Sequence, residues 1–148
     1  MGSVRRSIAA ALLALVASMA SAADAPVDLA ALKGKVVYVD FWASWCVPCR
    51  QSFPWMNAMH RQYGSAGLFV VAVNMDQTRA DADAFLQKYP AEFSVRFDPT
   101  GQLASTFKVR GMPTSALVGR DGKVLLVHEG FRDRDKAALE QAIRTALN

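Results

Sequence analysis

The stretch Val36–Cys49 reads VVYVDFWASWCVPC, and it decides the fold. Its first seven residues form a nearly continuous apolar run, which is typical of a strand buried on both faces in a largely parallel sheet. A helix is predicted from Cys46 to about Tyr63, because apolar residues recur there at every third or fourth position, and Gly64 is where it is expected to stop. Both cysteines then fall in the first helical turn, where their sulfurs can form a small disulfide ring.

The chain of 148 residues contains only these two cysteines. A bridge between neighbours in one turn removes little chain entropy, so a disulfide-stapled scaffold is excluded and the pair is expected to serve chemistry. A helix N-terminus favours the thiolate form of a cysteine in its first turn. A zinc knuckle would need two more ligands, and because His60 and His128 lie at no recognised metal spacing, no metal site is predicted.

Strands and helices alternate along the rest of the chain. Runs of β-branched and apolar residues predict further strands at Leu68–Val73, Val95–Phe97, Thr114–Val118 and Val124–His128. Further helices are predicted at Arg79–Tyr89, at Leu103–Phe107 as one or two turns, and at Arg134–Ala146 behind an Asp133 cap. The pair Asp121-Gly122 predicts a hairpin between the last two strands. This order predicts one α/β domain, a mixed β-sheet flanked by helices on both faces.

The composition is that of one globular domain. Hydrophobic residues make up 52% of the chain and charged residues 20%, with a formal net charge of +4. A disordered chain is excluded, because burial of that much apolar surface can offset the entropy of folding. Two of the 17 basic residues, Arg5 and Arg6, stand at the very start, and no block of Lys and Arg remains that favours nucleic acid. No nucleic-acid partner is therefore expected.

Residues 1–22 have the pattern of a secretory signal peptide. A basic start is followed by an uncharged Ala/Leu/Val run from Ser7 and by the small-residue triplet of residues 20–22. We expect cleavage after Ala22, which leaves a domain of residues 23–148 in a periplasmic compartment where disulfides persist. The alternative is a retained membrane anchor, although the run from Ser7 to Ala23 is shorter than the roughly 20 residues that span a bilayer.

Two separate motifs point to one family. Val39–Arg50 reads VDFWASWCVPCR, Pro54 follows it, and Gly111–Thr114 reads GMPT. These stretches resemble the active site, the helix-kinking proline and the cis-proline loop of the thioredoxin superfamily, and more narrowly of its exported TlpA/ResA-type thiol-disulfide oxidoreductases. The resemblance covers about Val36–Leu147 and implies a thioredoxin-like fold. Between the two motifs the chain is longer than in a minimal thioredoxin, which implies the central insertion typical of the TlpA branch.

The resemblance implies a role for each matched residue. Cys46 would attack a client disulfide and Cys49 would resolve the mixed disulfide, so this redox-active pair needs no other cofactor. Pro113 would be cis and would place the Met112 backbone beside the sulfurs, where an extended client segment can pair with it. The same resemblance assigns client contact to Trp45, Val47 and Pro48, whereas Trp42 is expected in the core.

Asp40 is the most informative single residue. An ionisable group inside an apolar strand is costly unless paired, and desolvation is expected to raise its pKa. From the residues alone, a carboxylate bonded to backbone amides is the alternative. The resemblance implies instead a buried acid that exchanges a proton with Cys49 during resolution. Ala72 aligns with the lysine that accompanies this acid in thioredoxins, so the pKa of Asp40 is expected to rise further.

Three departures from the TlpA pattern are expected to matter. Many TlpA-type proteins carry Asn at the position of Asp40. Once the expected leader is removed, only Ala23–Lys35 precede the first strand, so part of the usual β-hairpin is expected to be missing. Thr114 stands where the cytochrome-c-maturation branch tends to carry Glu, which weakens assignment to that branch.

The resemblance implies a periplasmic, monomeric reductant of client disulfides. A membrane thiol donor would supply its electrons, and apocytochrome c or copper-site assembly proteins would be its clients. The Val-Pro dipeptide between the cysteines favours a reducing poise. An oxidant or isomerase of the same fold is the first alternative. The second is a copper-carrying assembly protein that uses both sulfurs and His128.

Overall fold

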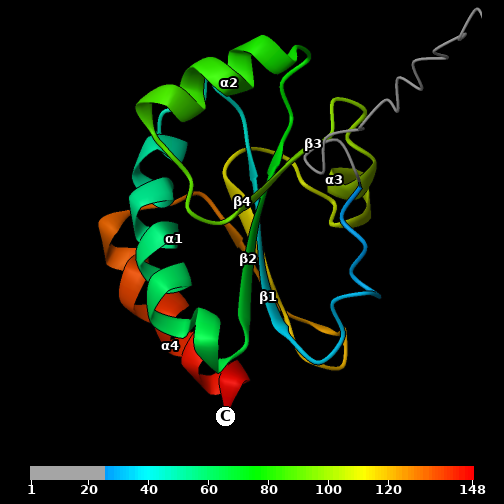
Figure 1. Ribbon diagram of the computed structural model, residues 1–148, viewed down its shortest axis with the longest axis vertical. Helices are drawn as coiled ribbons and strands as arrows, with labels where there is room; N and C mark the ends of the chain where they lie inside the picture. The colour runs from blue at the N-terminus through cyan, green and yellow to red at the C-terminus, as the bar shows by residue number, and fades with distance from the viewer. Residues whose placement is uncertain (1–25) are drawn as a thin grey trace, which may run out of the picture.

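The computed structural model describes residues 26–148, which form one five-stranded sheet and its covering helices (Figure 1). The strands are β1 (Val36–Trp42), β2 (Leu68–Asn74), β3 (Ser94–Phe97), β4 (Thr114–Val118) and β5 (Val124–Glu129). The helices are α1 (Cys49–Tyr63), α2 (Arg79–Lys88), α3 (Gln102–Thr106) and α4 (Lys136–Leu147), with short 3-10 turns at η2 (Gly64–Ala66) and η3 (Asp133–Asp135). The predicted leader, its cleavage site and the domain start at residue 23 lie outside the described residues.

β1 lies at the centre of a sheet with the order β3-β2-β1-β4-β5. It pairs in parallel with β2 and antiparallel with β4, while β2 pairs in parallel with β3 and β4 antiparallel with β5. The predicted mixed sheet is therefore confirmed. All seven residues of β1 are buried, which explains the continuous apolar run in the sequence. α2 and the edge strand β3 occupy the stretch in which the resemblance places an insertion.

Both faces of the sheet are covered, as predicted. Tyr38 and Trp42 of β1 belong to the core beneath α1 and α4, together with Phe53 and Ile143 from those helices. The opposite face carries a second core, whose members from the sheet, α3 and the N-terminal segment include Val37, Val39, Phe41, Ala104, Val27, Leu29 and Leu32. Figure 1 shows α1 and α4 on one side of the sheet and α3 on the other. Alternating side chains of one strand therefore serve two cores.

The predicted hairpin between β4 and β5 is confirmed. Gly122 takes a positive φ of 83°, and the Gly119 amide donates to the Lys123 carbonyl at 2.8 Å to close the turn. This backbone conformation is one that glycine adopts without steric cost. The hairpin brings β5 to the edge of the sheet beside β4.

α1 begins at Cys49, three residues later than predicted. Pro48 is its N-cap, with φ −62° and ψ −25°, and the ring of a proline disfavours helical geometry in the residue before it. Val47 and Cys46 therefore stay outside the helix. The prediction that both sulfurs lie in the first helical turn is wrong: Cys49 opens the helix, and Cys46 lies in the turn that leads to it.

The predicted end of the first helix is confirmed, whereas the predicted cap of the last helix is wrong. α1 ends at Tyr63 with Gly64 as its C-cap, and the chain then continues through η2 to Gly67, where φ is 106°. Asp133 caps no helix: its carboxylate pairs with Lys136 at 2.7 Å. Asp135 instead accepts a hydrogen bond from the Arg132 amide at 2.9 Å, which anchors the start of η3 and delays α4 to Lys136.

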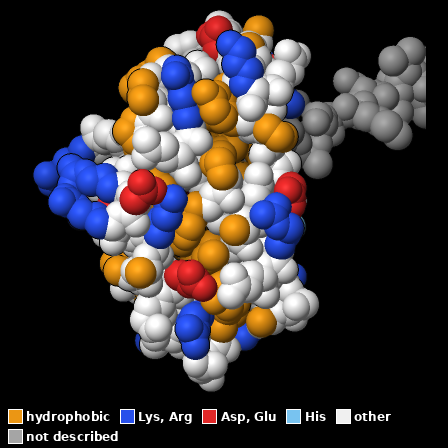
Figure 2. All heavy atoms as spheres, turned by 90° about the vertical axis from the view of Figure 1, so that its left-hand side faces the viewer, with side chains coloured by type: hydrophobic (Ala, Val, Ile, Leu, Met, Phe, Trp, Pro, Cys, Tyr) orange, Lys and Arg blue, Asp and Glu red, His pale blue; other side chains and the backbone are white. Residues whose placement is uncertain are grey.

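The segment before β1 contains no strand over residues 26–35, so the missing β-hairpin is confirmed for the described part of the chain. Asp28 instead accepts hydrogen bonds from the Ala30 and Ala31 amides and holds a turn. Within residues 26–148, no helix has both the length and the apolar character to cross a membrane. Figure 2 shows the outer face of the helical layer, where Lys and Arg side chains stand in separate groups among apolar and acidic ones, without a continuous basic surface.

Candidate active site

The two cysteines are joined by a disulfide where the chain passes from β1 into α1. Their Cα atoms are 5.4 Å apart, and no free cysteine occurs in the described residues. Cys46 is 2% exposed and Cys49 is fully buried, so Cys46 is the more accessible sulfur, in the predicted order. The Cys46 amide donates to the Ala43 carbonyl at 3.1 Å, which fixes the turn before the helix.

Exposed apolar side chains border the disulfide. Trp45 is 66% exposed and Val47 is 59% exposed, and Pro48 beside them is also exposed. These three residues form the active-site rim. The predicted core position of Trp42 is confirmed, because that side chain is fully buried. Large apolar side chains left in water next to a reactive sulfur are suited to contact with another protein.

The Met112–Pro113 peptide bond is cis, as the resemblance implied. Pro113 leads directly into β4, whose first residue Thr114 pairs with Phe41 near the C-terminal end of β1. The cis-proline loop therefore lies at the same end of the sheet from which the cysteine turn departs. The Thr114 hydroxyl donates to the Gly111 carbonyl at 2.7 Å and holds the loop closed.

Asp40 lies in the buried centre of β1, and among residues 26–148 no cation contributes to the shift of its pKa. Its Oδ2 atom is buried and has no hydrogen-bond partner. Ala72 is its register partner on β2, as predicted, and Ser115 is its partner on β4. Desolvation by burial raises the pKa of Asp40 well above the usual carboxyl value, which confirms the expected direction. The alternative of a carboxylate bonded to backbone amides finds no support at Oδ2.

Alternation along β1 directs Asp40 to the same face as Tyr38 and Trp42, which is the face that carries both cysteines in its core. Burial, and then the nearby negative charge of Asp40, raise the pKa of Tyr38, while a hydrogen bond from Ser115 opposes them. Asp40 therefore lies on the face of the sheet whose core contains both cysteines.

A hydrogen-bond network that the sequence did not reveal anchors the cysteine turn to the end of β2. The Asp76 carboxylate is almost fully buried. It accepts hydrogen bonds from the Ser44 amide at 2.9 Å, the Ser44 hydroxyl at 2.9 Å and the Asn74 side-chain amide at 2.8 Å. The signal in the sequence was the pair of polar residues directly after a buried strand. Charge-assisted bonds of this kind position the turn that carries Trp45 and Cys46.

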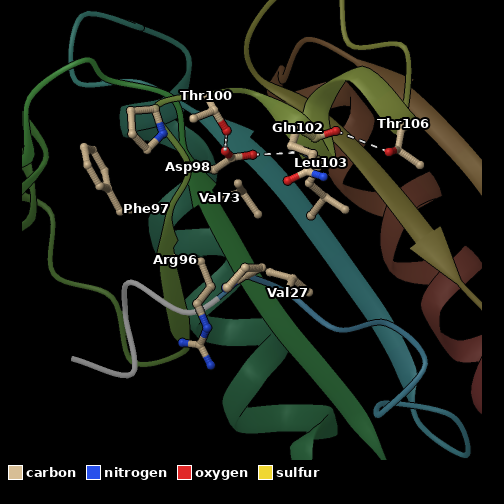
Figure 3. Close-up of a pocket in the computed structure, with 11 residues that line it drawn as sticks. Val27, Val73, Arg96, Phe97, Asp98, Thr100, Gln102, Leu103 and Thr106 are labelled. Atoms are coloured by element: carbon tan, nitrogen blue, oxygen red, sulfur yellow. Dashed lines mark hydrogen bonds between the residues drawn. The ribbon is translucent and has the colours of Figure 1, made fainter. Parts of the chain in front are cut away.

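Two pockets lie on different parts of the surface. One of about 270 Å³ adjoins the cysteine turn and is lined by Ser44, Arg50 and side chains of α2. The other, of about 560 Å³, lies between β3, α3 and the N-terminal segment (Figure 3). There Asp98 accepts hydrogen bonds from the Thr100 hydroxyl at 2.8 Å and the Leu103 amide at 3.1 Å. None of the predicted site residues lines the larger pocket, so the sequence did not lead to it.

Known proteins share both the sequence and this arrangement. The model of the Redoxin family matches residues 11–143. A thiol-disulfide oxidoreductase ResA from Bacillus thuringiensis subsp. konkukian is 33% identical over 118 residues, which cover 80% of this chain and 67% of the relative. A Chlorobium tepidum structure assigned as a thiol:disulfide interchange protein DsbE is 59% identical, with a TM-score of 0.80 over 82% of this chain and 86% of that one.

An exposed lipoprotein thioredoxin, Etrx1 of Streptococcus pneumoniae strain TIGR4, is 33% identical. Its TM-score is 0.69 over 79% of this chain and 89% of that one. The α/β thioredoxin fold, the Cys46–Cys49 disulfide and these relatives agree on one chemistry, with disulfide-containing client proteins as its substrates. The chain therefore belongs to the Redoxin family of the thioredoxin superfamily and is a thiol-disulfide oxidoreductase of the TlpA/ResA and DsbE type.

Proposed function

We propose that this protein works in the periplasm as a reductant of disulfides in client proteins. The observation that carries the proposal is the Cys46–Cys49 disulfide, bordered by the exposed active-site rim and underlain by the unpaired Asp40. A reductant of this kind ends each turnover with the Cys46–Cys49 pair oxidised. The Val-Pro dipeptide between the cysteines supports the reducing direction.

The reaction divides into an attack and a resolution. In the reduced protein the Cys46 thiolate attacks one sulfur of the client disulfide, so that a mixed disulfide forms and one client thiolate leaves. The Cys49 thiol then gives its proton to the Asp40 carboxylate. The Cys49 thiolate attacks the Cys46 sulfur, the Cys46–Cys49 disulfide forms, and the second client thiolate leaves. The dithiol has passed one electron pair to the client and needs no other cofactor.

Client contact is assigned to the groups that surround the sulfurs. Trp45, Val47 and Pro48 offer an apolar contact surface, and the Met112 backbone beside the cis bond can pair with an extended client segment. The pocket of about 270 Å³ along Ser44 and Arg50 extends this surface toward α2. A client that has locally unfolded around its disulfide meets these requirements best, because an extended segment is needed for strand-like pairing.

The leader and the relatives support the proposed location and partners. Residues 1–22 have the pattern of a signal peptide, and Etrx1 is by its name an exposed lipoprotein. We assign cleavage after Ala22, with retention as a membrane anchor as the alternative. A membrane thiol donor would return electrons to the pair, and apocytochrome c or copper-site assembly proteins would be reduced by the monomer. No nucleic-acid partner is proposed.

The Cys49→Ser variant tests the client assignment. Without the resolving thiol, the mixed disulfide at Cys46 is expected to persist, because its only intramolecular exit is removed. Exporting cells that carry this variant should accumulate disulfide-linked complexes, which mass spectrometry can assign to a Cys46–client linkage. The Cys46→Ser variant is the matched control and should capture no client. Equal capture by both variants, or capture of no cysteine protein by Cys49→Ser, would contradict the proposal.

The copper-carrying alternative finds no support in the site. It requires the two sulfurs and His128 to meet, whereas no group of three or more His, Cys, Asp or Glu side chains among residues 26–148 is arranged to hold a metal ion. His128 lies on the edge strand β5 against Asp135 instead. An oxidant or isomerase would use the same Cys46–Cys49 dithiol, and it would differ from the proposed reductant in the direction of electron flow.

A further inference from the structure

A row of polar residues crosses the sheet from the buried Asp40 toward its edge. Asp40 on β1 pairs with Ser115 on β4, and Ser115 pairs with His128 on β5. Register partners in an antiparallel pair direct their side chains to the same face, with Cβ atoms about 5 Å apart. The irregularity in the β4–β5 pairing lies at Leu117/Val118, beyond this row. Asp40, Ser115 and His128 are therefore lateral neighbours on one face.

Exposure rises along this row. Asp40 is 2% exposed and Ser115 is 4% exposed, while the side chain of His128 is 27% exposed. Ser115 lies close enough to Tyr38 to lower the pKa of its hydroxyl, so the Ser115 side chain faces the polar groups of this core. A hydroxyl both donates and accepts, and it can hand a proton from one neighbour to the next. The row thus joins a buried carboxylate to a group in contact with water.

His128 has the surroundings of a proton carrier. Its Nε2 atom is buried, makes no hydrogen bond, and lies 3.3 Å from Oδ2 of Asp135. Around this pair, Arg134 lies 3.9 Å from the other Asp135 oxygen, and Lys136 is paired with Asp133. Imidazole is the side chain that most readily changes charge near neutral pH.

The opposite side of Asp40 offers no such route. Its register partner there is Ala72, which carries no polar side-chain atom. The next strand in the same row is β3, where Val95 pairs with Ala72. Polar side chains in the row lie only toward β4 and β5. A proton that Asp40 accepts from Cys49 therefore meets an apolar neighbour on one side and the Ser115 hydroxyl on the other.

We propose that His128 is the exit for the proton that Asp40 accepts during resolution, with Ser115 as the link between them. This rests on the proposed function, because it takes Asp40 as the base for Cys49. In each turnover the Cys49 proton passes to Asp40, moves through the Ser115 hydroxyl to the His128 imidazole, and leaves to water as Asp40 returns to the carboxylate. His128 does not touch the sulfurs; it acts through Asp40, held by Asp135.

Stopped-flow mixing of the reduced full-length protein with the aromatic disulfide dithiobis-nitrobenzoate separates the two steps. Attack by Cys46 releases one coloured thionitrobenzoate, and resolution by Cys49 releases the second. His128→Ala is expected to leave the first phase unchanged and to slow the second by about tenfold near neutral pH, because the Asp40 proton loses its exit. Added imidazole should restore the second phase, because the His128 side chain is partly exposed and its removal opens the site to water.

His60→Ala is the matched control. It removes the other imidazole of the chain, which also has a buried nitrogen without a partner, from a helix position outside the row. It should change neither phase. Ser115→Ala should slow the second phase without rescue by imidazole. The relay would be overturned if the second phase of His128→Ala kept the wild-type rate. It would also be overturned if imidazole failed to rescue His128→Ala while the His128→Gln variant had a second phase of wild-type rate.

Asp40→Asn separates this inference from the function on which it rests. A slow second phase in Asp40→Asn with a normal one in His128→Ala removes the relay and leaves Asp40 as the base. A second phase of wild-type rate in both variants would show that Asp40 is not the base for Cys49, and it would contradict the relay as well. The expected result is a slow second phase in both, with imidazole rescue only for His128→Ala.

Discussion

Replacing Asp40 by Asn is expected to slow the resolution of the mixed disulfide by about 100-fold near neutral pH, the lower end of what a positioned base contributes. Asn keeps the size of the side chain and cannot accept the Cys49 proton. Asp40 has no cation beside it, and its Oδ2 is free of hydrogen bonds, so the carboxylate is available for that proton. Single-turnover release of thionitrobenzoate measures the rate of this step.

The same experiment provides its own control, because attack by Cys46 comes first and does not use Asp40. That phase should keep its wild-type rate in Asp40→Asn, whereas the resolution phase should lose the pH dependence that the carboxylate imposes. Between about pH 6 and about pH 9, the resolution rate of the variant should approach the wild-type rate only toward the upper end, where hydroxide can take the Cys49 proton in place of the missing base. A resolution phase of unchanged rate over this whole range would remove Asp40 from the mechanism.

The same substitution should make the oxidised protein more stable, and increasingly so as the pH rises. Burial raises the pKa of Asp40 in the folded state above its unfolded value. Between the two values the folded chain binds the extra proton, so the free energy of unfolding falls as the pH increases. Asn carries no charge in either state and avoids that loss. Between about pH 5 and about pH 8 we expect the stability of Asp40→Asn relative to the wild type to rise by about 1–3 kcal/mol, because the variant avoids ionising a buried carboxyl.

Urea unfolding of the disulfide-bonded form at several pH values measures this gain without interference from titrating thiols. Asp121→Asn is the matched control, because Asp121 is exposed and its pKa is lowered by the hydrogen bond that it accepts from the Lys123 amide. That variant should show no growing gain in stability with pH. If Asp40→Asn were destabilising at every pH, the buried carboxylate would have to be held by favourable contacts.

Local chain chemistry was enough to predict most of the fold. The bounds of β1 and β4 agree with the prediction, because both are short, wholly buried strands. The start of α1 was misplaced because Pro48 disfavours helical geometry at Val47, although the apolar residues that follow recur at helical spacing. The cap of the last helix was assigned to Asp133, whereas Asp135 stands at the N-cap position and its carboxylate accepts a hydrogen bond from the Arg132 amide at the start of η3.

Parts of the site depend on contacts that no local pattern encodes. Asp76 and Ser44 are 32 residues apart, and their hydrogen bonds form only when β2 pairs with β1. The alignment with thioredoxins did place Ala72 correctly beside Asp40, because it relied on an equivalent strand. The neighbourhood of His128 was missed, because it depends on the register of β5 against β4. The sequence of an edge strand without one clearly buried face specifies its register only weakly.

The central claim is that the Cys46–Cys49 pair gives electrons to client disulfides, and its reduction potential tests this most directly. The purified protein is equilibrated with glutathione buffers of defined ratio, and the fraction of disulfide is read from trapped thiols. The account predicts a potential below about −220 mV, on the reducing side of the glutathione pool and toward thioredoxin. A potential near about −120 mV, as in strong disulfide oxidants, would contradict it and reverse the direction of electron flow.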